Sequence, residues 1–161
     1  KENSDSAFKW LQRVHEESIS KMSGVAKDLN IFNSLRDVFP ESNRLYVCEL
    51  NGQRIAGLLV LLYKKTVEYF TPVVLESYKS TQVLSALVND VMINLAEEGY
   101  HLWNWGGTWP SQKGVYRFKS RWGALDYKYR YFNKIYDGSI MRMEKSDILS
   151  NFPSYYVRCF K

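Results

Sequence analysis

The sequence has few of the residues that usually bind metals or form disulfides. Among its 161 residues are only two histidines and two cysteines, and Cys48 and Cys159 lack the spacing of a metal site. Lone cysteines are usually small buried hydrophobic residues. We therefore expect no metal and no disulfide framework, and these absences favour a reducing cytoplasm as the compartment.

Long apolar runs are also missing. The longest candidate, residues 55–63, has the length of a strand, whereas a helix that crosses a bilayer needs about 20 apolar residues. The first ten residues, KENSDSAFKW, contain no apolar core of a signal peptide. The sequence thus predicts one globular domain over residues 1–161 without a membrane span. Because it begins with Lys1, we expect it to be the C-terminal part of a longer protein.

Negative charge is nearly absent from one segment. Residues 113–134 hold seven basic residues and one acidic residue, a formal charge of +6 in a chain whose total is +5. A basic segment interleaved with aromatic residues could bind phosphates, RNA or an acidic lipid surface. The alternative is a solvated helix face followed by an edge strand protected by lysines.

The hydrophobic pattern predicts helices and strands in a definite order. Helices are expected over residues 6–22, 27–39, 83–95, 112–122 and 146–161, and strands over 44–50, 53–63, 66–73, 101–105 and 127–136, with a last strand after Asp137-Gly138. Asn51-Gly52 predicts a tight hairpin, since both central residues of such a turn need positive φ. Pro72 cannot donate to a sheet, so we expect the third strand to break there and the sheet to open.

This order resembles that of the GNAT acetyltransferase fold without its first strand. The segments WNWGGT (residues 103–108) and KGVYRFKSRWGA (residues 113–124) are similar to the strand, glycine turn and helix of the Fem-type (FemAB-like) peptidyltransferases. The resemblance implies an α+β GNAT-like fold, a mixed, mostly antiparallel central sheet flanked by helices. It also implies an unpaired or partner-covered sheet edge where the first strand is missing.

Lys119 stands apart on the helical wheel of residues 112–122. Val115, Phe118 and Trp122 share one face, and Lys113, Arg117 and Arg121 lie roughly opposite. Lys119 falls beside Tyr116, about 70° from the apolar centre, which predicts a position at the rim of a cleft. By resemblance to the Fem-type enzymes it stabilises charge on the donor and the tetrahedral intermediate, with Phe118 as its packing partner. The alternative is a lysine that lies along an apolar helix edge.

Other residues are candidates for binding the donor or substrate. Gly106-Gly107 permits positive φ and close approach of a ligand, with the Thr108 hydroxyl nearby, or else is only a turn before Pro110. Asn104 alternates with Trp103 and Trp105 and is expected on the other sheet face. Relatives often have an acidic residue where Asn104 stands. Lys113 and Tyr116 complete the expected set on the helix.

The donor itself is left open by the residues before the long helix. GNAT enzymes that bind acetyl-CoA have a glycine-containing pyrophosphate loop there, but LESYKSTQVLS has no glycine. We expect four residues there to cap the helix and to bind one phosphate: Tyr78, Lys79, Ser80 and Thr81. We also expect them to face the same cleft as Lys119. The donor is therefore acyl-CoA or, as the Fem-type resemblance implies, aminoacyl-tRNA.

The general base is also open. Glu49, Glu68 and Glu76 are candidates that the sequence does not rank, whereas His15 and His101 are interpreted as structural. The resemblance implies an N-acyltransferase or aminoacyltransferase that acts on an amine, with an upstream GNAT-like domain or a second copy as partner. One alternative is a non-catalytic module that binds RNA or a partner domain through residues 113–134. Another is a half-domain that completes the sheet of another chain.

Overall fold

The computed structural model describes residues 1–22, 24–108, 111–128, 130, 132 and 134–151. The chain divides into two compact units, Lys1–Ala124 and Leu125–Lys161. Predictions that fall on residues 152–161, including the end of the last helix, lie outside the described residues. Among the described residues, no helix has both the length and the apolar character that a bilayer span requires.

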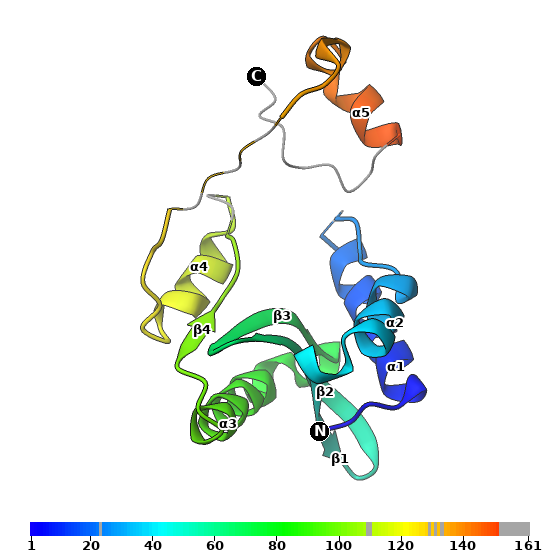
Figure 1. Ribbon diagram of the computed structural model, residues 1–161. Helices are drawn as coiled ribbons and strands as arrows, with labels where there is room; N and C mark the ends of the chain where they lie inside the picture. The colour runs from blue at the N-terminus through cyan, green and yellow to red at the C-terminus, as the bar shows by residue number, and fades with distance from the viewer. Residues whose placement is uncertain (23, 109–110, 129, 131, 133, 152–161) are drawn as a thin grey trace. The chain divides into compact units, whose positions relative to one another are not determined.

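The first unit is built on a four-stranded sheet in the order β1-β2-β3-β4 (Figure 1). The strands are β1 (Asn43–Leu50), β2 (Gln53–Tyr63), β3 (Thr66–Val74) and β4 (Leu102–Asn104). β1 to β3 are antiparallel, and β4 runs parallel to β3. The β1–β2 turn has positive φ at Asn51 and Gly52, at 52° and 76°, as the hairpin prediction required. The predicted α+β class is confirmed.

Helices cover both faces of this sheet (Figure 1). On one face lie α1 (Asp5–Ser20) and α2 (Leu29–Val38), which bury Phe8, Leu11 and Phe32 against strand residues such as Leu45 and Leu59. On the other face lies α3 (Val83–Glu97), whose Val88, Val91 and Leu95 pack on Leu58 and Val60. Alternation along β2 thus gives each face its own apolar core.

The pairing of β3 with β4 is much shorter than the rest of the sheet. It comprises three residue pairs, Thr66–Glu68 with Leu102–Asn104, after which no described residue continues β4 beside β3. β3 itself continues through Pro72 to Val74, so the predicted break at Pro72 is wrong. The irregularity lies earlier, where Phe70 is the extra residue opposite the Leu59/Val60 step. Because β4 has already diverged, the missing Pro72 N–H costs no bond on that side.

α4 (Lys113–Ser120) closes the first unit, and β1 forms a sheet edge to which the Glu2 N–H donates one backbone bond at Leu45. In the second unit the strand predicted over residues 127–136 is wrong for the described residues, which contain no strand there. Tyr127, Phe132 and Tyr136 are more than 80% exposed, so strand propensity without a partner strand does not produce a strand.

The strand predicted after Asp137-Gly138 is also wrong. Asp137 instead accepts a bond from the Ser139 backbone and caps a 3-10 helix, η3 (Gly138–Met141). α5 (Lys145–Asn151) follows as the described part of the predicted last helix.

Candidate active site at the divergence of two strands

The candidate site begins where β3 and β4 separate. Glu68 is the register partner of Asn104, the last residue of β4, and the two side chains lie on the α1/α2 face of the sheet. The Asn104 amide nitrogen donates to Glu68 Oε2, and its Oδ1 accepts the Gly106 N–H at 3.0 Å. The orientation of this amide follows from chemistry, because an N–H needs the oxygen and a carboxylate needs the N–H₂. Asn104 therefore joins the carboxylate to the glycine turn.

The glycine turn is held from its other side by Lys119. Its Nζ donates to the Gly106 carbonyl at 3.2 Å, the Gly107 carbonyl at 3.0 Å and Thr108 Oγ1 at 2.9 Å. These three bonds use all the donors of an ammonium group. Lys119 is only 9% exposed, so the predicted rim position is corrected to a buried one beneath the turn.

The backbone conformation favours glycine at position 106, and the space beside it is tight. Its φ is +68°, and a Cβ there would lie 3.3 Å from Glu68 Oε1. The backbone of the turn therefore approaches the carboxylate as closely as the chain allows. The predicted positive φ is confirmed for Gly106.

Charge and burial act against each other at this site. Burial raises the pKa of Glu68 above its ordinary value, and the positive charge of Lys119 opposes that rise. Burial likewise lowers the pKa of Lys119, which Glu68 opposes. A half-buried carboxylate with a raised pKa beside a buried cation has the properties of a proton acceptor in a reaction site.

Aromatic side chains form the opposite face of the divergence. Trp105 packs at ring-centroid distances of 5.0 Å from Tyr69, 5.6 Å from Trp103, 5.8 Å from Phe118 and 5.9 Å from Trp122. The prediction that Trp103 and Trp105 share one face and Asn104 lies on the other is confirmed, and the structure shows that the tryptophan face packs in the core. Phe118 packs in this cluster, which anchors the helix that carries Lys119.

The remaining predictions for α4 have mixed outcomes. Arg117 and Arg121 are exposed as predicted, and so is Lys113. Val115 is 41% exposed, so its predicted position against the sheet is wrong. The eight-residue helix buries only the later part of the expected apolar face, because its first turn precedes the aromatic cluster. Tyr116 is half exposed on the same helix.

The residues predicted to cap the long helix do not do so. Tyr78, Lys79, Ser80 and Thr81 belong to a separate 3-10 helix, η2 (Glu76–Thr81), and the N-cap of α3 is Gln82 at a φ of 62° without a capping side chain. Lys79 pairs with Glu76, and Thr81 Oγ1 donates to the Tyr78 carbonyl. Positive φ at Gln82 separates the two helices, which the sequence pattern does not reveal. Within the described part of the chain, none of these four residues contacts Lys119 through a polar group.

The structure ranks the three candidate bases. Glu49 is exposed and 3.7 Å from Arg54, and Glu76 pairs with Lys21 and Lys79, which lower its pKa. Glu68 is half-buried, and burial raises its pKa. The signal in the sequence was a glutamate inside an otherwise apolar strand, but its pairing with Asn104 required the register.

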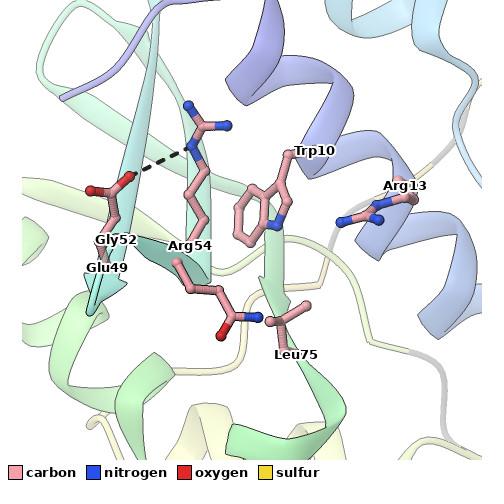
Figure 2. A pocket seen from close by; sticks show the side chains of 7 residues that line it. Trp10, Arg13, Glu49, Gly52, Arg54 and Leu75 are labelled. Atoms are coloured by element: carbon pink, nitrogen blue, oxygen red, sulfur yellow. Dashed lines mark ion pairs between the residues drawn. The ribbon is translucent and has the colours of Figure 1, made fainter.

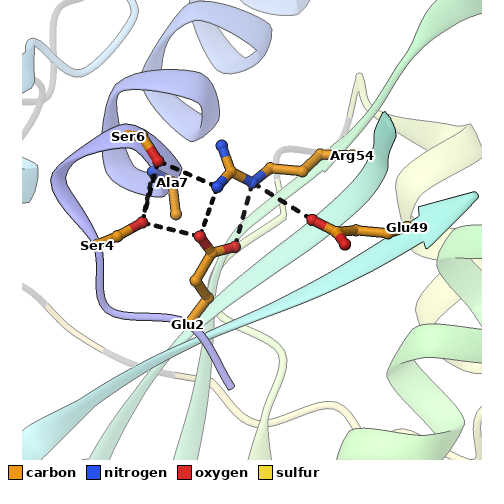
Figure 3. A network of polar contacts seen from close by, with 6 residues as sticks. All are labelled: Glu2, Ser4, Ser6, Ala7, Glu49 and Arg54. Carbon is orange, nitrogen blue, oxygen red and sulfur yellow. Dashed lines mark hydrogen bonds and ion pairs between the residues drawn. The ribbon is translucent and has the colours of Figure 1, made fainter. Parts of the chain in front are cut away.

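A separate hollow lies at the tip of the β1–β2 hairpin. It has a volume of about 390 Å³, and its lining includes Trp10, Arg13, Glu49 and Arg54 (Figure 2). Arg54 is held by Glu2 and Ser6 of the N-terminal segment and by Glu49 (Figure 3). Its charge is therefore neutralised within the chain, and the lining includes Glu49 of the candidate bases but none of the residues predicted to bind the donor or substrate.

His15 has a structural environment, as predicted. Its Nε2 accepts the Lys27 N–H at 3.2 Å, and its ring meets Phe32 edge-on with centroids 6.0 Å apart. Burial, with a smaller contribution from Lys27, lowers the pKa of His15 to about 4. His101 is exposed at the start of β4, where its N–H donates to the Lys65 carbonyl.

Comparison with solved structures supports the fold. The chain is similar to an aminoglycoside acetyltransferase from an uncultured soil metagenomic sample, with a TM-score of 0.62 and 13% identity over 83% of this chain and 93% of that one. A possible acetyltransferase from Clostridium difficile 630 gives 0.65 and 10% over 81% and 93%. The ribosomal-protein-S18-alanine N-acetyltransferase of Escherichia coli gives 0.55 and 13% over 71% of each chain.

Sequence comparison identifies the family. No curated protein matches the chain. The family model described as "Acetyltransferase (GNAT) domain" matches residues 2–129, which include β1 to β4, the glycine turn and Lys119. This match identifies the GNAT family but does not distinguish the Fem-type subgroup that the sequence resembles. The chain belongs to the GNAT acetyltransferase domain family.

Proposed function

We propose that this domain is an N-acyltransferase that moves an acyl group from a CoA thioester to an amine, at the divergence of β3 and β4. The observation that carries the proposal is the connected set of Glu68, Asn104, Gly106 and Lys119. It joins a carboxylate of raised pKa to a glycine turn fixed by a buried cation. Membership of the acetyltransferase family supports acetyl-CoA as the donor in preference to aminoacyl-tRNA.

Glu68 is the proposed general base. It accepts a proton from the acceptor ammonium, and the neutral amine then attacks the carbonyl carbon of the thioester. The new C–N bond forms as the carbonyl electrons move to oxygen. When the tetrahedral intermediate collapses, the C–S bond breaks and CoA leaves as a thiolate. After attack the nitrogen carries a positive charge, and it becomes a neutral amide when it loses its second proton, which the thiolate takes up to become the free thiol. Glu68 releases the first proton to solvent, so that the net products are the amide, the thiol and one proton.

Lys119 acts in this proposal through its position and charge. All three of its donors bond the glycine turn, so the turn keeps one conformation beside Glu68. Its positive charge also favours the negative charge that develops on the carbonyl oxygen, because a buried charge is poorly screened. The resemblance to the Fem-type enzymes agrees with this second role.

The test measures thiol release from acetyl-CoA in the presence of amines, for the wild type and for Glu68→Gln. Glutamine keeps the size of the side chain but cannot accept the proton, so we expect the transfer rate to fall by about 10²- to 10⁴-fold. Glu49→Gln is the matched control, because Glu49 is an exposed carboxylate at the far hairpin tip. Equal rates for the wild type and Glu68→Gln would refute the assignment of the base.

A further inference from the structure

An apolar groove leads to Glu68 on the α1/α2 face of the sheet. It has a volume of about 460 Å³ and is lined by Leu61, Tyr63, Thr66, Glu68 and Phe70. Leu61 lies opposite Glu68, and Tyr63 opposite Thr66, in the β2–β3 ladder. Among the described residues that line the groove, Glu68 is the one carboxylate. The groove therefore joins a single negative charge to a mainly apolar surface.

Positive charges flank the groove. The Nζ of Lys27 lies 4.8 Å from the centroid of the Phe70 ring, and that of Lys64 lies 5.3 Å from the centroid of the Tyr63 ring. Lys27 is held beside this face because its backbone N–H bonds to buried His15. A ligand with one ammonium group can pair with Glu68, but a second ammonium group along the groove would meet Lys27 or Lys64.

We infer that the acceptor is a primary amine with a single positive charge and an apolar body, such as an arylalkylamine or alkylamine. Its ammonium group pairs with Glu68, and its apolar body lies on Leu61, Tyr63 and Phe70. This inference rests on the proposed function, since it assigns the acceptor of the same site. It also separates this chain from one structural neighbour, which is an aminoglycoside acetyltransferase by name, because an aminoglycoside carries several amino groups.

The experiment compares three amines as acceptors with acetyl-CoA as donor: phenethylamine, ethanolamine and spermidine. Burial of a phenyl ring predicts that kcat/KM for phenethylamine exceeds that for ethanolamine by about tenfold or more. Spermidine should be the poorest of the three. Tyr63→Ser, at a side chain that is 71% exposed and can be replaced without disturbing the core, should reduce the preference for phenethylamine.

Reversal of one flanking charge gives a matched test. Lys64→Glu should raise kcat/KM for spermidine severalfold relative to phenethylamine. Lys65→Glu should not, because the Lys65 ammonium lies toward Gly99 and is not part of the groove. Equal use of phenethylamine and ethanolamine, a preference for spermidine, or equal effects of the two charge reversals would overturn the inference.

The outcome is separable from that of the proposed function. If Glu68→Gln abolishes transfer but the amine preferences are absent, only the inference about the acceptor fails. If no amine is acetylated, calorimetric titration of the protein with phenethylamine in the absence of acetyl-CoA still tests whether the groove binds this amine. Binding that weakens in Tyr63→Ser supports the inference, and no binding to the wild type overturns it.

Discussion

The two sides of strand β3 differ in a way that separates stability from chemistry. Toward β2, pairing runs from Ala56↔Val74 to Tyr63↔Thr66, and helices bury both faces. Toward β4, pairing stops after three residues, and the exposed ends of the pairing carry Glu68 and Asn104. A parallel strand that diverges leaves backbone and polar side chains open to a ligand. The long pairing with β2 holds β3 in place, so β3 does not need β4 beyond the three paired residues.

The largest effect on stability should come from the β1–β2 side. Leu45 is 1% exposed and packs in the α1/α2 core, so Leu45→Ala should lower the free energy of unfolding by about 2–5 kcal/mol, measured with urea. Leu50→Ala, at the exposed end of the same strand, is the control and should cost less than about 1 kcal/mol. The kcat of folded Leu45→Ala should stay within about twofold of wild type. A 100-fold loss of kcat would contradict the assignment of stability to the β2 side of β3 and chemistry to the β4 side.

Lys119→Met should have the opposite profile, with its main effect on catalysis. Loss of the buried charge and of the bonds to the turn should reduce the transfer rate by about 10²-fold. Two carbonyls also lose their donor, so stability should fall by about 1–3 kcal/mol, measured by thermal and urea unfolding.

Arg117→Met is the control for this variant, because Arg117 is exposed two residues earlier on α4. Its transfer rate should stay within a few-fold of wild type, while any binding to a polyanion becomes less sensitive to salt. Equal losses of transfer in both variants would remove the special role of Lys119. They would favour α4 as a basic docking surface instead.

His15 offers a pH-dependent probe of the helix-covered side. Its pKa is about 4 in the folded chain and about 6.5 when unfolded, so the unfolded state binds the proton first as pH falls. The stability contributed by neutral His15 is present above about pH 6.5 and is lost toward pH 4, by roughly 2–3 kcal/mol. The free energy of unfolding, measured with urea at pH 7 and pH 4.5, should decrease less on acidification in His15→Gln than in the wild type. An equal decrease in both proteins would exclude His15 as the source of this pH dependence.

The sequence predicted the elements of the first unit well because their signals are local. Residues 53–63 match β2, Asn51-Gly52 forms the expected turn, and the helix expected over residues 83–95 matches α3. The alternating tyrosines of residues 127–136 carry an equally clear local pattern. The described residues of this range form no strand, because strand formation depends on a partner that the pattern does not specify.

The site was predictable in part for a related reason. Lys119, Gly106 and Asn104 were identified from a motif, yet the motif does not show that Lys119 is buried under the turn or that Asn104 bonds Glu68. The burial of Lys119 depends on how α4 packs against the turn that precedes it, and the bond between Asn104 and Glu68 depends on the register of β3 and β4. Residues 78–81 were misjudged because one residue with positive φ, Gln82, redirects the chain before α3.

The most direct test of the central claim is the pH dependence of kcat/KM in the wild type and in Asn104→Asp. Aspartate keeps an oxygen for the Gly106 N–H but loses the donor to Glu68 and adds a negative charge beside it. Both changes disfavour ionised Glu68, so the acidic limb, already above the ordinary glutamate range, should move upward by about one pH unit or more. The high-pH rate should stay within about tenfold of wild type. An acidic limb at the same pH in both proteins would contradict Glu68 as the base of this site.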